Sequence, residues 1–208
     1  YPGYFDRFLD AVAADPEAAA DDYYFDAATA HLYFQPNAVY NVLYAFRKVM
    51  ADHGLDKPLW LVETNAPPMD DPYWIVPNWT LAVSLNEQAA FIPQALAAAI
   101  SAGAERIAVY KLRDTEADHA ANPEPFGLVR WDDSRRPAYN TYRVAIELMA
   151  GATAAERERW DAVGQVHRQV HQHPAGPGGH HQHSAAEEDR FLHIVGDEHH
   201  RLAPLPPD

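Results

Sequence analysis

Apolar positions in the first two thirds of the chain recur at two different spacings. The opening twelve residues follow the three-to-four-residue spacing of a helix, with apolar side chains at Tyr4, Phe5, Phe8, Leu9 and Val12. Residues 59–64 instead form a short, nearly continuous apolar run, which is typical of a buried parallel strand. We therefore expect helices and strands to alternate over residues 1 to about 150.

The expected order is helix, strand, helix, strand, helix, strand, helix. The strands are expected at 25–33, 59–64 and 106–110, and the later helices at 37–53, 84–102 and 137–149. Asn37 is a candidate N-cap, while Ser84 and Glu87 have the spacing of a capping box. Gly103 suits the residue that follows a helix. This alternation predicts an α/β fold with a parallel sheet and helices outside it.

The chain length limits what such a sheet can be. With 208 residues, the chain is shorter than the roughly 250 residues of a complete (β/α)8 barrel. Three strands are too few for a closed barrel, so the fold is either small and unusual or lacks earlier βα units. The chain starts without a Met and without the basic stretch and apolar core of a signal peptide. We expect a piece of a longer parent protein.

Composition excludes several classes of function. The net charge of −14 argues against nucleic-acid binding, which needs clustered Lys and Arg. No apolar run approaches the roughly 18 residues of a membrane span. The absence of cysteine excludes disulfides and thiol catalysis. Oligomeric state and compartment are left open, including an extracellular location for the parent protein.

The last part of the chain has a different composition. Nine of the twelve His lie from His167 onward, among many Gln, Pro and Gly. Clustered imidazoles suit transition metals, but we expect a low-complexity tail without defined ligand geometry. Residues 1–150 are thus expected to form one portion of a barrel. Residues 151–208 are expected to form a linker and a largely irregular tail, with a truncated or frame-shifted β-domain as the alternative.

Candidate chemistry lies at the ends of the expected strands, where parallel α/β folds carry their functional groups. Glu63 ends an apolar strand, where a carboxylate needs hydrogen-bond partners. His31 and Tyr33 are two residues apart and so face the same side of the preceding strand. The Tyr hydroxyl is placed to donate to a carboxylate on the next strand. The structural alternatives are a salt-bridged or solvated Glu63 and a Tyr33 that only closes the end of the fold.

These segments resemble a known group of enzymes. Residues 30–33, 60–65 and 107–110 resemble strands six, seven and eight of retaining glycoside hydrolases of the large (β/α)8 clan, which includes cellulase, β-xylosidase and β-galactosidase relatives. Residues 126–131 and 136–139 resemble the ending of such a barrel. The resemblance covers about residues 1–150 and implies a partial (β/α)8 TIM barrel, about strands six to eight with flanking helices.

The resemblance also implies residue roles. Glu63 matches the nucleophile of strand seven, and Tyr33 matches the Tyr that hydrogen-bonds it. His31, Tyr110 and Trp79 are the expected sugar contacts. The implied substrate is a carbohydrate, with no metal and no organic cofactor.

One member of the catalytic pair is missing from the match. Retaining hydrolysis uses two carboxyl groups about 5 Å apart, and the acid/base Glu of strand four would lie upstream. We therefore expect this polypeptide alone to be inactive or nearly so, although its parent would be a glycosidase.

Two rival interpretations remain. The chain is a non-catalytic carbohydrate-binding or scaffold protein of TIM-barrel origin, in which case glycan binding survives Glu63→Gln. Alternatively it is a different (β/α)8 enzyme, which is favoured if Lys111 or Arg113 reaches into the cleft to hold an anionic substrate.

Overall fold

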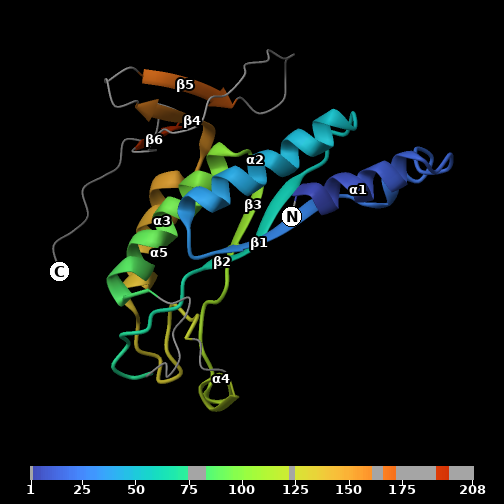
Figure 1. Ribbon diagram of the computed structural model, residues 1–208. Helices are drawn as coiled ribbons and strands as arrows, with labels where there is room; N and C mark the ends of the chain where they lie inside the picture. Colours follow the sequence, from blue (N-terminus) through green and yellow to red (C-terminus); the bar gives the residue numbers. More distant parts are fainter. Residues whose placement is uncertain (1, 75–82, 122–124, 161–165, 172–190, 197–208) are drawn as a thin grey trace. The chain divides into compact units, whose positions relative to one another are not determined.

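The computed structural model describes residues 2–74, 83–121, 125–160, 166–171 and 191–196 (Figure 1). The chain divides into two compact units, residues 1–145 and 146–208. The elements in chain order are α1 (Pro2–Ala13), the 3-10 helix η1 (Asp22–Tyr24), β1 (Ala28–Tyr33), α2 (Pro36–Asp52), β2 (Leu59–Asn65), α3 (Leu85–Ser101), β3 (Arg106–Val109), α4 (Glu116–Ala121), α5 (Pro137–Met149), β4 (Ala152–Trp160), β5 (Val166–His171) and β6 (Phe191–Gly196).

The first unit is built on a parallel sheet of three strands in the order β1-β2-β3. The expected α/β class and the three expected strands are confirmed. Leu59 and Leu61 of β2 are completely buried, and each such side chain stabilises the fold by about 1.5–3 kcal/mol. Because the strands are parallel, their carboxyl ends and the loops that follow lie at one end of the sheet (Figure 1).

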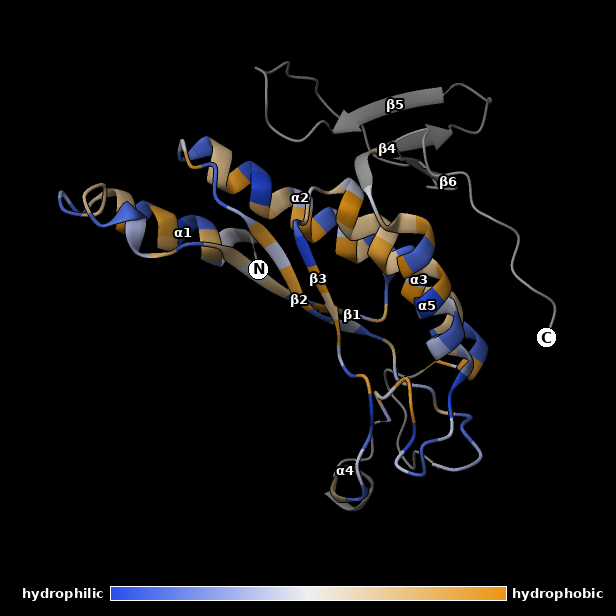
Figure 2. Cartoon of the chain, turned by 180° about the vertical axis from the view of Figure 1, so that it is seen from behind, coloured by the Kyte–Doolittle hydropathy of each residue, from blue (hydrophilic) through white to orange (hydrophobic). Residues whose placement is uncertain are grey.

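Helices α2 and α3 pack against this sheet and against each other. The face that α2 buries has helical spacing and consists of Val39, Tyr40, Leu43, Phe46 and Met50. Figure 2 shows hydrophobic and hydrophilic residues alternating along both helices, as expected of helices that bury one face.

The helix ends agree with the sequence in two places and differ in one. The capping box at Ser84 and Glu87 is present in both directions, and Gly103 has the positive φ of +84° that suits a helix end. Asn37 is not the N-cap of α2, because Pro36, with its fixed φ, takes the first helical position. The short helix α4 was not expected.

A bulge in β2 sets the direction of its last residues. Ala30 of β1 pairs with Leu61, but His31 pairs with Glu63, so Val62 is the extra residue on β2. In a regular strand neighbouring side chains alternate between faces, and His31 would have paired with Val62. The bulge instead brings Glu63 opposite His31, a use typical of bulges beside functional sites.

The second unit contains a three-stranded antiparallel sheet in the order β5-β4-β6. The sequence predicted a largely irregular tail, and for the described residues this is wrong. Valines in β5 and Phe, Leu, Ile and Val in β6 favour strands and flank the His-rich runs. The remaining His-rich residues lie outside the described part of the chain.

A search of the described residues for membrane spans found no helix long and apolar enough to cross a bilayer.

Candidate functional site

Glu63 and Tyr33 meet at the carboxyl end of the parallel sheet. The Tyr33 hydroxyl donates a hydrogen bond of 2.6 Å to Oε2 of Glu63. Tyr33 is the last residue of β1, and Glu63 lies two residues before the end of β2. The Glu63 side chain is 32% exposed, so it is held by the protein and still reaches solvent. This contact gives the Tyr33 hydroxyl a carboxylate partner on the neighbouring strand, as the sequence predicted.

His31 approaches the same carboxylate oxygen. Its Nδ1 lies 3.1 Å from Oε2 of Glu63, and its side chain is 56% exposed. The ring contacts Glu63 directly and remains largely exposed, and the predicted sugar contact of His31 stays a prediction. Both contacts converge on Oε2 and neither involves Oε1, so the two oxygens of Glu63 are in different environments.

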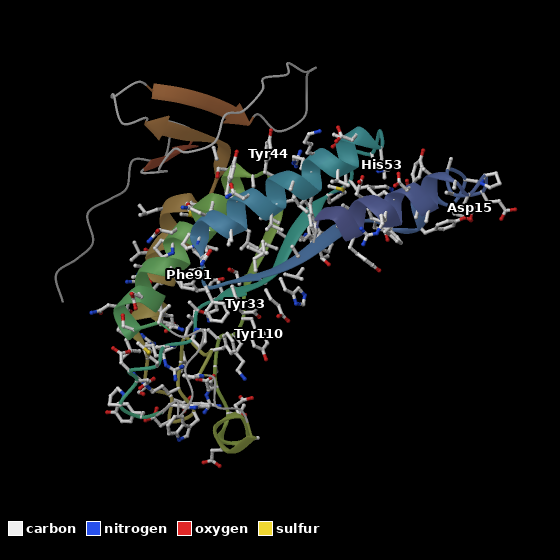
Figure 3. All side chains as sticks on the ribbon, viewed as in Figure 1. Asp15, Tyr33, Tyr44, His53, Phe91 and Tyr110 are labelled. Atoms are coloured by element: carbon white, nitrogen blue, oxygen red, sulfur yellow. The ribbon has the colours of Figure 1, made fainter. Side chains whose placement is uncertain are left out.

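Phe126 links the two tyrosines of the site. Its ring makes edge-to-face contacts with Tyr33, at 5.4 Å between centroids, and with Tyr110, at 5.7 Å. In Figure 3, Tyr33 and Tyr110 lie near each other at the end of the sheet. Tyr110 follows β3 and is 38% exposed, which suits the predicted role as a sugar contact. The peptide bond between Tyr110 and Lys111 is cis.

Asn65 fixes the loops beneath these rings. Its completely buried side chain donates to the carbonyls of Tyr110, at 2.7 Å, and Phe126, at 2.6 Å. Its Oδ1 accepts from the backbone of Ala66 at 2.8 Å. One amide side chain therefore joins the end of β2 to the segments carrying both aromatic residues.

A buried ion group of two arginines and two aspartates lies in the loops that follow β2 and β3, and the sequence did not predict it. Arg136 donates to Asp71 and to Asp114, each at 2.6 Å, and Arg130 donates to Asp71 at 2.9 and 3.0 Å. Burial of Asp71 acts to raise its pKa, but hydrogen bonds from Arg130 and Arg136 outweigh it and hold the pKa below its ordinary value. The partners are far apart in sequence, so no local pattern identifies them.

The two cations proposed as anion ligands have other partners. Lys111 forms an ion pair of 2.6 Å with Asp118. Arg113 contacts Asp133 at 2.7 Å and the carbonyl of Trp131 at 2.6 Å. Both side chains are engaged within the loops, so the geometry gives no support to an anion-binding (β/α)8 enzyme.

One expected sugar contact and one group of metal-binding residue types remain to be placed. Trp79, the remaining expected sugar contact, lies outside the described residues. Among the described residues, Asp6, Asp10 and His53 have ligand atoms within 4.8 Å of one another. These three side chains lie on α1 and at the end of α2, and His53 pairs with Asp6 at 3.0 Å.

No protein-family model and no curated protein sequence matches the chain. The chain superimposes on a family 39 glycoside hydrolase from the gut symbiont Bacteroides cellulosilyticus WH2 with a TM-score of 0.52 and 18% identity, covering 76% of this chain and 34% of that one. It also matches a GH2 β-galacturonidase from Eisenbergiella tayi bound to galacturonate (TM-score 0.48, 15% identity, 60% and 24% covered) and a glucosidase from Croceicoccus marinus (TM-score 0.47, 17% identity, 65% and 30% covered).

The chain therefore spans about a quarter to a third of the length of these solved structures. Identities this low concern the fold and leave the chemistry open. The fold of the chain is similar in part to that of a TIM-barrel glycoside hydrolase.

Proposed function

We propose that this chain is the C-terminal part of a retaining (β/α)8 glycoside hydrolase, with β1, β2 and β3 as strands six, seven and eight. Glu63 is the nucleophile, Tyr33 holds it, and Tyr110 contacts the sugar. The observation that carries the proposal is the 2.6 Å hydrogen bond from Tyr33 to Glu63 at the carboxyl end of a parallel sheet.

The uneven surroundings of the Glu63 carboxylate suit nucleophilic attack. Tyr33 and His31 both contact Oε2, which fixes the orientation of the group and leaves Oε1 to attack the anomeric carbon. A bond forms between Oε1 and that carbon while the bond to the leaving group breaks, and the leaving group takes the electron pair. Water then hydrolyses the glycosyl ester in a second step.

The second carboxyl group is expected upstream of this chain. Asp71 and Asp114 are buried in ion pairs with arginine. Asp118 pairs with Lys111, whose hydrogen bond helps lower the pKa of Asp118 to about 2, so this carboxyl group is ionised near neutral pH. A group that protonates a leaving group requires a raised pKa, and the pKa values of Asp71 and Asp118 are lowered. Asp114 is held in its buried ion pair with Arg136.

A mechanism-based label tests the proposal on this chain alone. A 2-deoxy-2-fluoroglycosyl fluoride reacts without acid catalysis, because fluoride leaves unaided, and its glycosyl ester hydrolyses slowly. We expect one compound of a panel of such fluorides to add a single glycosyl unit to Glu63, located by peptide mass spectrometry. An ordinary aryl glycoside should not be turned over.

Three variants show whether the label depends on Glu63. Glu63→Gln should abolish labelling, and Tyr33→Phe should slow it, while Glu87→Gln on the exposed start of α3 should label as the unaltered chain does. Labelling at another residue, or none across the panel, would contradict the assignment of Glu63.

Exposed aromatic residues favour one alternative, a carbohydrate-binding protein without catalysis. Tyr73 and Tyr110 are both substantially exposed, and such rings can stack on sugars. In that case glycan binding, measured by calorimetry, should persist in Glu63→Gln and no label should form.

A further inference from the structure

Both the N–H and the carbonyl of Gly127 are hydrogen-bonded to the buried ion group. Its N–H donates to Oδ1 of Asp114 at 2.8 Å, and its carbonyl accepts from Nη1 of Arg136. The same Nη1 donates to Oδ2 of Asp114 at 2.6 Å. Arg136, Asp114 and Gly127 therefore form a closed set of hydrogen bonds, all of it buried.

Asp114 packs so closely against Gly127 that the Gly127 backbone cannot shift towards it. A Cβ atom built on Gly127 would lie 2.6 Å from Cγ and from the backbone nitrogen of Asp114. Arg136 is completely buried, and it also donates to Asp71 of the loop after β2 at 2.6 Å. The position of Gly127 is thus fixed by contacts that reach into the loops following both β2 and β3.

Phe126 carries this constraint to the catalytic pair. It directly precedes Gly127, its carbonyl accepts from Asn65, and its ring contacts Tyr33. The Phe126 side chain is buried, so its ring cannot move far unless its backbone moves. A shift of Gly127 would therefore alter the packing of Tyr33, whose hydroxyl is bonded to Glu63.

We propose that Arg136 is a positioning residue for the Tyr33–Glu63 pair, acting through Gly127 and Phe126. It touches neither member of the pair, and its role follows from holding the peptide next to the ring that packs on Tyr33. The functional meaning of this role rests on the function proposed above, but the contact itself can be measured without any sugar.

Carbon-13 NMR of the chain labelled at tyrosine Cζ tests the proposal, because this carbon reports the hydrogen bonding of the phenol. Tyr33→Phe assigns the resonance, and Glu63→Gln defines its position when the carboxylate acceptor is lost. We expect Arg136→Lys, which keeps the charge but loses the planar fork, to move the Tyr33 resonance towards the Glu63→Gln position. Phe126→Leu should move it in the same direction.

Arg113→Lys is the matched control, since Arg113 serves the same loops through Asp133 and Trp131 and not through Gly127. This variant should leave the resonance in place. A folded Arg136→Lys chain with an unmoved Tyr33 resonance would overturn the proposal, even if its thermal midpoint falls. If that variant does not fold, Asp114→Asn is judged by the same criterion, because it keeps the side-chain shape and removes the charge facing Arg136.

The labelling rate separates this proposal from the proposed function. If Arg136 acts through Tyr33, Arg136→Lys as a single substitution should slow the labelling of Glu63. Added to a chain that already carries Tyr33→Phe, the same substitution should slow labelling little further. If Arg136→Lys slows labelling equally with and without Tyr33→Phe, the proposal is overturned. Absence of any labelling with a displaced Tyr33 resonance would reject the nucleophile and retain the positioning contact.

Discussion

At the scale of single residues, the candidate site depends on how one carboxylate is turned and held. The bulge at Val62 brings Glu63 opposite His31, and Tyr33 and His31 then contact the same oxygen. A strand without the bulge would pair His31 with Val62 and turn Glu63 towards the other face. The arrangement of the candidate site therefore depends on a backbone irregularity as much as on the residue types.

Asp118 allows a residue-scale prediction about charge. Hydrogen bonds from Lys111 and Thr115 lower its pKa from 3.8 to about 2, with Lys111 as the largest cause. We expect Lys111→Met to raise the pKa of Asp118 towards 3.8 without reaching it, because Thr115 still donates. Carboxyl carbon-13 titration measures this shift, and Lys48→Met, which breaks the exposed pair with Asp52, should leave Asp118 unchanged.

The same shift predicts a pH dependence of stability. Since the pKa of Asp118 is lower in the folded chain than in the unfolded one, its ionised form stabilises the fold above about pH 4. That contribution is lost as the pH falls from about 4 to about 2. Lys111→Met should show a smaller acid-induced loss of unfolding free energy in this window, and an equal loss would contradict the pairing.

At the scale of elements, the sequence predicted those helices and strands that depend on residues close together in the chain. The apolar run of β2, the capping box of α3 and the start of α5 at Pro137 all depend on residues within one turn or one strand. The bulge in β2 and the buried ion group depend on distant partners instead. Arg130 and Arg136 meet Asp71 across 59 and 65 residues, a separation at which no periodicity operates.

The capping box gives a prediction for α3. Ser84 accepts from the backbone of Glu87 at 3.1 Å, and Glu87 accepts from the backbone of Ser84 at 2.7 Å. Ser84→Ala removes the first of these bonds and should lower the unfolding free energy by about 1 kcal/mol. Denaturant unfolding measures this loss. Asn86→Ala, at an exposed position in the same turn, should cause no loss, and equal losses in both variants would contradict a capping role.

At the scale of the whole molecule, fold class and site were predictable to different degrees. Alternating periodicity predicted the parallel sheet, and strand ends predicted where Glu63, His31 and Tyr33 would gather. For the second unit the sequence favoured an irregular tail and kept a truncated or frame-shifted β-domain as the alternative, because β5 and β6 lie among His- and Gln-rich residues. β5 has only two apolar residues, Val166 and Val170, so it shows neither the apolar run of β2 nor a regular alternation.

The division into two units predicts how a shortened chain behaves. The strand pairs of the parallel sheet run from Ala28 to Val109, whereas β4 pairs with β5 and β6. Helix α5 ends at Met149, and Gly151 has a φ of +77°, which suits a helix end. We therefore propose residues 1–150 as the barrel portion and expect a chain ending at Ala150 to unfold cooperatively, with the Tyr33 resonance unchanged. Circular dichroism should place its thermal midpoint within about 4 °C of the full chain, the shift that about 1 kcal/mol produces at this size. A non-cooperative transition would mean that the parallel sheet requires the second unit.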